Sequence, residues 1–230
     1  MCIRDSACIV SFLNGTDKKS LSPKDCYIVG KNIARLHNAS KKLRLYRKNT
    51  LAVPKLNQLL ISISKKINKV QKNILDEMKN EFKFLKKSWP KNLISGIIHC
   101  DLFIDNIFFY KNKYYGFIDF YFSANDFLVY ELSICINALC FNKKGKKYFL
   151  NKRKSTNLIK GYESIRKLTN NEKKYFNMLC RGSALRYLLT RAYDYLNTPK
   201  DAFIKIKDPR EYIQKLKYHQ SMNNFEDYLK

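Results

Sequence analysis

Acidic residues, glycines and prolines are scarce in this sequence, and it contains no G-x-G-x-x-G motif. Asp and Glu together number 19 against 45 Lys and Arg, which gives a formal net charge of +26. Such a charge attracts nucleic acid or an anionic membrane. The lysines are spread along every segment, however, and no RNP, zinc-knuckle or helix-turn-helix signature accompanies them. We therefore interpret the charge as a compositional bias and expect no specific nucleic-acid partner and no membrane partner.

Long hydrophobic runs and paired cysteine motifs are also missing. The longest apolar stretch, residues 127–141, is interrupted by Glu131, Ser133 and Asn137 and is too short to span a bilayer. The first residues lack an apolar signal-peptide region. The seven cysteines are an odd number without any C-x-x-C spacing, which disfavours a zinc site or a disulfide framework. We expect a cytoplasmic protein with reduced thiols, built as one domain or one large lobe of 230 residues.

The most informative stretch is residues 96–120, GIIHCDLFIDNIFFYKNKYYGFIDF. Two short apolar runs joined by a polar three-residue turn predict a β-hairpin. The hairpin would hold Asp101 and Asn106 in the loop before its first strand and Asp119 at the end of its second. Transfer of a phosphoryl group from ATP needs such a set, because one carboxylate accepts the proton of the attacking hydroxyl while an Asn and a second Asp hold Mg²⁺.

The same residues also have an ordinary structural explanation, because Asp and Asn often cap turns. The H-x-D-x-x-x-x-N spacing alone leaves the two interpretations balanced. The hairpin and the Asp-Phe pair that ends it favour the kinase interpretation.

The remaining pattern is mostly helical. Ser22 and Pro23 predict the start of a first helix, and Thr169-x-x-Glu172 predicts a capping box for a helix that reaches about Leu196. Further helices are predicted over 54–85, over 127–141 with Asn125 or Asp126 as the cap, and from Asp208 onward. Residues 121–125 are predicted to form a loop, and 142–170 a loop, a short helix and a turn.

The segment HCDLFIDNIFFYKNKYYGFIDFYFSANDFLVYELSICINALCF resembles the core of the homoserine kinases of the aminoglycoside-phosphotransferase-like type. LCRGSALRYLLTRAYDYLNTP and KDPREYIQKLKYH are similar to the last two helices of the same family. The likeness runs from about Ala7 to His219. It implies an α+β, protein-kinase-like fold: a mainly helical large lobe with a catalytic β-hairpin, and a small lobe that is mostly missing.

The resemblance further implies a reaction and its cofactors. ATP and L-homoserine would give ADP and O-phospho-L-homoserine, a step towards threonine, with Mg²⁺ on the phosphates. Asp101 would act as the base, chiefly by orienting the hydroxyl for in-line attack. Asn106 and Asp119 would bind Mg²⁺. His99 would brace the loop through a hydrogen bond.

The resemblance also suggests residues for the nucleotide and the acceptor. The run from Ala7 to Leu13 would be the hinge that meets adenine, with Ser11 and Phe12 in contact with the nucleotide. Substrate contacts are expected from Tyr121, Asp126, Arg186 and Arg191. Homoserine is a zwitterion, so either arginine would bind its carboxylate and Asp126 or Glu131 its ammonium group.

We expect four segments: an artefact over 1–6, a remnant of the hinge strand over 7–15, the helical large lobe over 16–222 and a tail over 223–230. The groups that cover and orient the phosphates are absent from the 230 residues, so the chain alone is expected to be a fragment with negligible turnover. Three alternatives stay open. They are a related kinase for an aminoglycoside, choline or methylthioribose, an inactive binding fragment, and a basic nucleic-acid binder.

Overall fold

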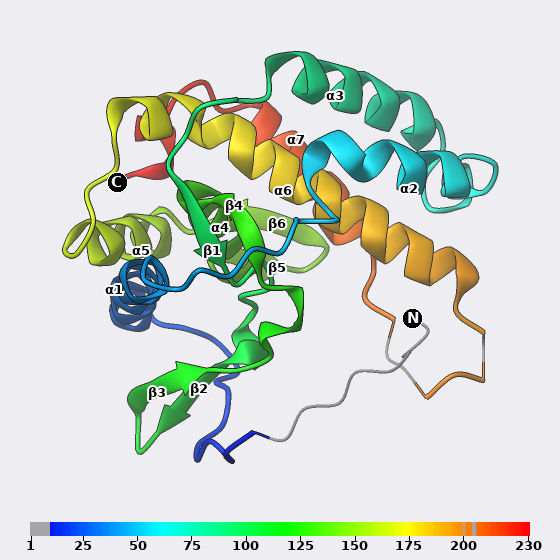
Figure 1. Cartoon of the computed structure of the whole chain (residues 1–230). Coiled ribbons are helices and arrows are strands. Elements are labelled where there is room, and N and C mark those ends of the chain that lie inside the picture. Colours follow the sequence, from blue (N-terminus) through cyan, green and yellow to red (C-terminus); the bar gives the residue numbers. More distant parts are fainter. Residues whose placement is uncertain (1–9, 200, 204–205) are drawn as a thin grey trace.

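The computed structural model describes residues 10–199, 201–203 and 206–230. Most of the described chain is a body of packed helices, and a β-hairpin projects below it (Figure 1). The helices are α1 (Pro23–Ser40), α2 (Leu56–Ile63), α3 (Ile74–Ser88), α4 (Leu128–Leu139), α5 (Lys152–Glu163), α6 (Asn170–Asn197) and α7 (Arg210–Gln220). The strands are β1 (Ser95–Ile98), β2 (Ile107–Tyr110), β3 (Lys113–Phe117), β4 (Ala124–Phe127), β5 (Phe141–Lys144) and β6 (Lys147–Leu150). No helix in the described part of the chain is both long and apolar enough to cross a membrane.

Capping residues start the two helices for which the sequence predicted them. The Ser22 hydroxyl accepts a hydrogen bond from the Asp25 N–H, and the Asp25 carboxylate accepts one from the Ser22 N–H, at 3.1 and 2.9 Å. Thr169 and Glu172 repeat this capping box at the start of α6. Each box satisfies two backbone N–H groups that the first helical turn leaves without partners. The predicted starts of α1 and α6 are confirmed.

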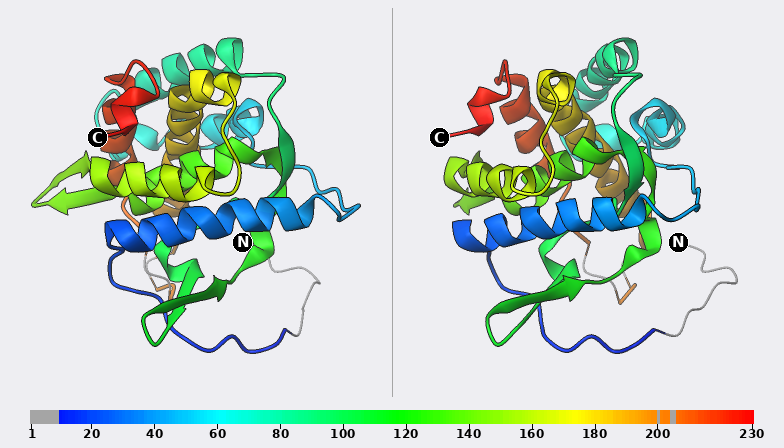
Figure 2. Two further views of the ribbon diagram at one scale, coloured as in Figure 1. Left: turned by 90° about the vertical axis from the view of Figure 1, so that its left-hand side faces the viewer. Right: turned by 60° about the vertical axis from the view of Figure 1, so that its left-hand side comes forward.

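Helices α1 and α5 lie side by side in both views of Figure 2. Two glycines allow the close approach. A Cβ atom on Gly30 would lie 2.0 Å from the Leu158 carbonyl oxygen, and a Cβ atom on Gly161 would lie 2.0 Å from that of Tyr27. The two helix backbones therefore approach closely at two points, and at each point one of the two helices carries a glycine.

The core lies between α4 and α6. Helix α4 is buried along nearly its whole length, including Glu131, Ser133 and Asn137. Helix α6 has 28 residues and crosses the body diagonally (Figure 1). It packs against α2, α3, α4 and α7, so it joins N-terminal and C-terminal parts of the body, as the α1–α5 contact also does.

The described strands form three antiparallel pairs: β1 with β4, β2 with β3, and β5 with β6. The β2–β3 pair is the predicted hairpin, with Ile107 opposite Phe117. In the first pair Ser95 lies opposite Phe127 and Ile98 opposite Ala124. This pairing brings the segment before the hairpin next to the segment after it.

Two of the predicted helices were wrong in extent. The predicted helix over 54–85 is split into α2, a 3₁₀ turn over Ile67–Lys69 and α3, with Asn73 in the left-handed region at φ 62°. A straight helix of that length would extend about 48 Å, whereas the break lets α2 and α3 both pack on α6. Residues 124–126, expected to be loop and helix cap, and Phe127, expected to start the next helix, form β4, because they find hydrogen-bond partners in β1.

Three other segments also differ from the expectation. Residues 141–150, expected in part as a loop, form the β5–β6 hairpin around Gly145. Within the predicted tail over 223–230, Phe225 and Tyr228 are buried, so these residues belong to the body. Residues 10–15 form no strand, and Thr16 alone makes a bridge to Phe109. Residues 1–9, which include the predicted artefact and the first part of the hinge, lie outside the described residues.

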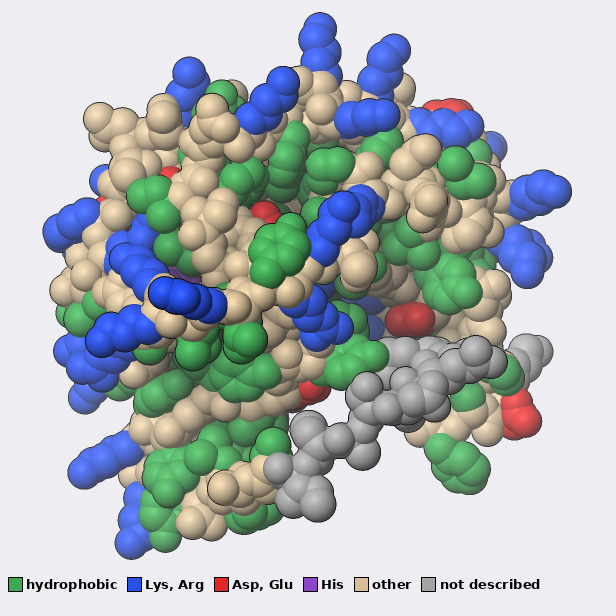
Figure 3. Space-filling view, viewed as in Figure 1, with side chains coloured by type: hydrophobic (Ala, Val, Ile, Leu, Met, Phe, Trp, Pro, Cys, Tyr) green, Lys and Arg blue, Asp and Glu red, His purple; other side chains and the backbone are tan. Residues whose placement is uncertain are grey.

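Lys and Arg side chains are distributed over the face seen in Figure 3 and are not gathered into a stripe. This distribution matches the even spread of lysines in the sequence.

Candidate functional site

The loop over residues 99–106 connects β1 to β2 and is held by hydrogen bonds from His99. The His99 Nε2 lies 2.8 Å from the Ile118 carbonyl oxygen, which can only accept, so Nε2 carries the proton. Its Nδ1 then accepts from the Asp101 N–H at 3.3 Å. The predicted bracing role of His99 is confirmed: it ties the start of the loop to the end of β3.

Glu131 of α4 anchors the same loop from below. Its carboxylate accepts the backbone N–H groups of His99 and Cys100, the second at 3.2 and 3.3 Å. The side chain is completely buried. The expectation that Glu131 binds a substrate ammonium group was therefore wrong, because the carboxylate is out of reach and is already used by the loop backbone.

Two residues of the site adopt the left-handed backbone conformation. Cys100 has φ 67° and Asp119 has φ 60°. Asp visits this region at modest cost, but Cys does so rarely, and such outliers gather at functional sites. The Cys100 side chain is buried, and burial raises the pKa of its thiol, so it serves as a small packing residue rather than as a nucleophile.

The three residues predicted to converge line one cavity of about 200 Å³. Asp101 and Asn106 reach it from the 99–106 loop, and Asp119 from the end of β3. Further walls come from α6 and from the segment before α7. The complete lining is Asp101, Phe103, Asp105, Asn106, Asp119, Tyr187, Arg191 and Lys207.

Asp101 lines this cavity and is partly buried. The Tyr187 hydroxyl lies 2.8 Å from the Cys100 carbonyl oxygen and 3.3 Å from Asp101 Oδ1. Burial raises the pKa of Asp101 above its ordinary value, and the charge of Arg186 and the hydrogen bond from Tyr187 oppose that rise. A carboxylate with a raised pKa is a better proton acceptor than a free one.

Asn106 and Asp119 provide oxygens of the kind that Mg²⁺ prefers. The Asn106 amide nitrogen donates to the Asp101 carbonyl oxygen at 2.8 Å, which leaves the amide oxygen for a ligand. Asp119 is exposed at the cavity rim. In the described residues no group of three or more His, Cys, Asp or Glu side chains forms a metal cage. Two oxygen donors with phosphate oxygens completing the shell are a usual Mg²⁺ arrangement, so the residues fit that ion.

The arginines of α6 have separate surroundings. Arg191 lines the cavity, and its Nη1 lies 2.8 Å from Glu211 Oε2 on α7. Arg186 is 2% exposed and does not line the cavity; its Nε and Nη1 have no hydrogen-bond partner among the described residues. Its charge acts on Asp101 from within the core. Of the two predicted carboxylate-binding arginines, Arg191 alone faces the space beside Asp101.

The other predicted contacts lie away from this cavity. Asp126 accepts a hydrogen bond from Asn49 at 2.6 Å, and the Tyr121 carbonyl accepts one from Arg47. Ser11 and Phe12 are exposed, Phe12 at 88%. None of these four predicted residues is among those that line the cavity.

Sequence reasoning missed four residues of the lining: Phe103, Asp105, Tyr187 and Lys207. Phe103 and Asp105 belong to the 99–106 loop, so their place inside the H-x-D-x-x-x-x-N motif was a usable signal. Lys207 carried no signal, because one lysine among so many is not distinctive. Tyr187 comes directly after Arg186, but nothing in the pattern of α6 indicated which aromatic residue faces the loop.

The model of the phosphotransferase enzyme family matches residues 4–164. The homoserine kinase of Sinorhizobium medicae is 41% identical over 222 residues, which cover 96% of this chain and 67% of that protein. The homoserine kinase of Agrobacterium fabrum is 42% identical, with 96% and 68% covered. The chain belongs to the phosphotransferase enzyme family and groups with its homoserine kinases. It spans about two thirds of the length of these curated relatives.

Solved structures of two other kinases share the fold. An ethanolamine kinase of Plasmodium vivax matches with a TM-score of 0.62 at 17% identity, covering 95% of this chain and 65% of that protein. Amicoumacin kinase, solved with AMP-PNP, Ca²⁺ and its antibiotic, matches with a TM-score of 0.60 at 12% identity, covering 95% and 63%. At these identities the likeness establishes the fold alone, and it confirms the expected kinase-like α+β architecture.

Proposed function

We propose that this chain carries the catalytic and acceptor-binding part of a homoserine kinase, which transfers the γ-phosphoryl group of ATP to the hydroxyl of L-homoserine. The observation that carries the proposal is the convergence of Asp101, Asn106 and Asp119 on one cavity in a chain about 40% identical to homoserine kinases. The nucleotide complexes among solved structures of the same fold support ATP as the donor.

Asp101 accepts the hydroxyl proton of homoserine and holds the hydroxyl in line with the phosphoryl group. Its place in the cavity lining, beside the Tyr187 hydroxyl, supports this role. Positioning supplies most of the rate in phosphoryl transfer, because the transition state needs little covalent help from the protein. Glu131 and His99 keep Asp101 in place through the loop backbone.

Asn106 and Asp119, which both line the cavity, would hold Mg²⁺. When bound, the ion neutralises charge on the phosphates. Asp119 is exposed and makes no ion pair with another described residue, so its carboxylate stays available for this purpose. Ser11 and Phe12 remain our candidates for the adenine contact, since they precede the segment that bridges to β2.

The test joins this chain to the part of the Sinorhizobium medicae enzyme that it does not span. The chimera is given Mg²⁺–ATP with L-homoserine, choline, methylthioribose or kanamycin, and ³¹P NMR follows the products. We expect phosphorylation of homoserine, with Asp101→Asn lowering the rate roughly 10²–10⁴-fold. Preference for any other acceptor would refute the assignment, as would an Asp101→Asn variant with the full rate.

A further inference from the structure

Arg191 is held in a fixed position at the α6 side of the cavity. Its Nη1 contacts Glu211, and its guanidinium carbon lies 4.5 Å from the centre of the Tyr212 ring. The other carboxylate oxygen of Glu211 accepts from Lys215 Nζ at 2.5 Å, so Glu211 is itself fixed. Arg191 Nε and Nη2 make no hydrogen bond within the described part of the chain. Arg191 therefore offers a preorganised pair of donors.

Lys207 and Asp105, which also line the cavity, form a looser pair. Their charged atoms are 3.4 Å apart, and both side chains are 56% exposed. An exposed pair of this kind contributes little to stability, because water solvates both charges well. The pair can therefore open for a ligand at small cost.

Phe103 connects the two cations. The Lys207 ammonium lies 5.1 Å and the Arg191 guanidinium 5.9 Å from the centre of its ring. The ring edge also packs on Tyr187, whose hydroxyl contacts Asp101. Both cations thus adjoin one ring and the same cavity as the proposed base.

We propose that Arg191, Lys207 and Asp105 bind the zwitterionic end of the acceptor. Its carboxylate lies between Arg191 and Lys207, and its ammonium group takes the place of Lys207 beside Asp105. Glu211 is a positioning residue, which fixes Arg191 through their hydrogen bond. This inference rests on one part of the proposed function: the acceptor is an alcohol whose hydroxyl group faces Asp101.

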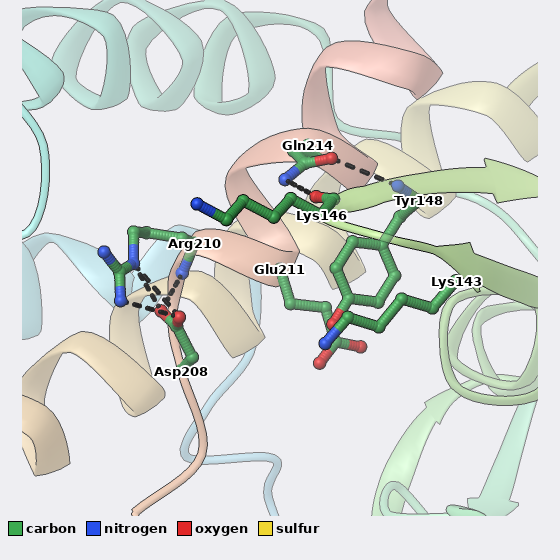
Figure 4. Close-up of a pocket in the computed structure, with 7 residues that line it drawn as sticks. All are labelled: Lys143, Lys146, Tyr148, Asp208, Arg210, Glu211 and Gln214. Carbon is green, nitrogen blue, oxygen red and sulfur yellow. Dashed lines mark hydrogen bonds and ion pairs between the residues drawn. The ribbon is translucent and has the colours of Figure 1, made fainter.

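A second cavity of about 350 Å³, which Glu211 lines, is the obvious competitor for an anion (Figure 4). Lys143 and Lys146 border it, but Arg210 there is paired with Asp208 at 2.9 Å. Asp101 is not among its lining residues. A carboxylate bound there would not hold a hydroxyl at the base, so Lys146 supplies a matched control.

The experiment measures binding of three related alcohols to the 230-residue chain by calorimetry. L-homoserine carries both charges, 4-hydroxybutanoate lacks the ammonium group, and 3-aminopropan-1-ol lacks the carboxylate. We expect L-homoserine to bind at least about tenfold more tightly than either analogue, because it makes charge-assisted hydrogen bonds through both its carboxylate and its ammonium group.

The variants separate the two contacts. Lys207→Met should weaken 4-hydroxybutanoate about threefold. It should not weaken 3-aminopropan-1-ol, because it removes the lysine that competes with the ammonium group for Asp105. Asp105→Asn should weaken L-homoserine and 3-aminopropan-1-ol only. Both positions are exposed, so both variants should fold. Arg191→Met should weaken both carboxylate-bearing alcohols about tenfold, and in this variant Glu211 keeps its ion pair with the buried Lys215. Lys146→Met should change none of the affinities.

Equal affinity for the three alcohols, no binding of L-homoserine, or Lys207→Met and Asp105→Asn variants with unchanged affinities would overturn the inference. Its failure is distinct from that of the proposed function. A chimera that phosphorylates homoserine while these variants bind normally keeps the function and removes the inference. If the chimera prefers another carboxylate-bearing alcohol and the variants still lose affinity as described, the inference stands and the proposed function fails.

Discussion

At the scale of single residues, Glu131 shows how much of the site depends on a side chain that cannot touch the substrate. It is fully buried, and both of its backbone partners belong to the 99–106 loop. A carboxylate can only accept hydrogen bonds, which suits two N–H groups that point at it.

Replacing Glu131 by Gln should disturb this arrangement, because the amide nitrogen is a donor and one oxygen must then serve two N–H groups. We expect the free energy of unfolding to fall by about 1–3 kcal/mol. The phosphotransferase rate of the chimera should fall at least about tenfold, since the loop that carries Asp101 loses its anchor.

Urea unfolding and the homoserine assay measure the two effects. Glu77→Gln is the matched control, because Glu77 is exposed on α3 and pairs with Lys217 at the surface. It should change the free energy of unfolding by less than about 0.5 kcal/mol. A Glu131→Gln variant as stable and as active as the parent would contradict the anchoring role.

The sequence predicted Asp101, Asn106 and Asp119 because they belong to one short motif and one hairpin. It did not predict the role of Glu131, because the hydrogen bonds to His99 and Cys100 span 31–32 residues. It also could not choose between Arg186 and Arg191. Which of them faces the cavity depends on how α6 is rotated against the 99–106 loop, and that is decided by packing.

At the scale of secondary structure elements, the contact between α1 and α5 depends on the absence of two side chains. Gly161→Ala would ordinarily stabilise an exposed helix by about 1 kcal/mol. Here the new methyl group would meet the Tyr27 carbonyl oxygen at 2.0 Å, so the helices must separate.

We expect Gly161→Ala to lower the free energy of unfolding by roughly 1–3 kcal/mol, the usual cost of overpacking. Thermal and urea unfolding measure this loss. Lys160→Ala, at the exposed neighbouring position, controls for the change in helix propensity and should be close to neutral. A stabilised Gly161→Ala variant would show that α1 and α5 do not pack as closely as described.

Elements with strong local signals were predicted well, and those that depend on distant partners were not. Capping residues identified the starts of α1 and α6, and a polar turn identified the β2–β3 hairpin. Strand β4 is four residues long and pairs with β1, which precedes it by about thirty positions, so its local sequence suggested a loop. The lysines of β5 and β6 likewise suggested a solvated loop, because short exposed strands lack the apolar alternation that identifies buried ones.

At the scale of the whole molecule, a buried histidine links the stability of the fold to pH. His219 of α7 lies 2.9 Å from the Tyr228 hydroxyl and 3.0 Å from Asn137 Oδ1, so it joins the C-terminal segment to α4. Burial lowers the pKa of His219 from 6.5 to about 3, helped by the charges of Lys215 and Arg181.

His219 is therefore protonated below about pH 6.5 in the unfolded chain, but only below about pH 3 in the folded chain. The stability that the neutral ring contributes is fully present above pH 6.5 and is lost as the pH falls towards 3. Between these values His219 should reduce the free energy of unfolding by up to about 1.4 kcal/mol per pH unit.

Urea unfolding at several pH values between 7 and 4 tests this, with His219→Gln as the comparison, because Gln keeps a donor and an acceptor but does not titrate. The variant should lose stability less steeply than the parent as the pH falls. Identical slopes would mean that His219 is not held neutral in the fold.

The spacing of the arginines along α6 limits which mutations this part of the chain can accept during evolution. Arg181, Arg186 and Arg191 are five residues apart, and each step of five turns the helix by about 140° past a full turn. Arg181 accordingly pairs with Glu81 of α3, Arg186 lies in the core and Arg191 reaches the cavity. Inserting or deleting one residue between Arg186 and Arg191 would rotate everything beyond it by about 100° and turn Arg191 away from the cavity. The segment can therefore accept exchanges of one amino acid for another, but its length is constrained.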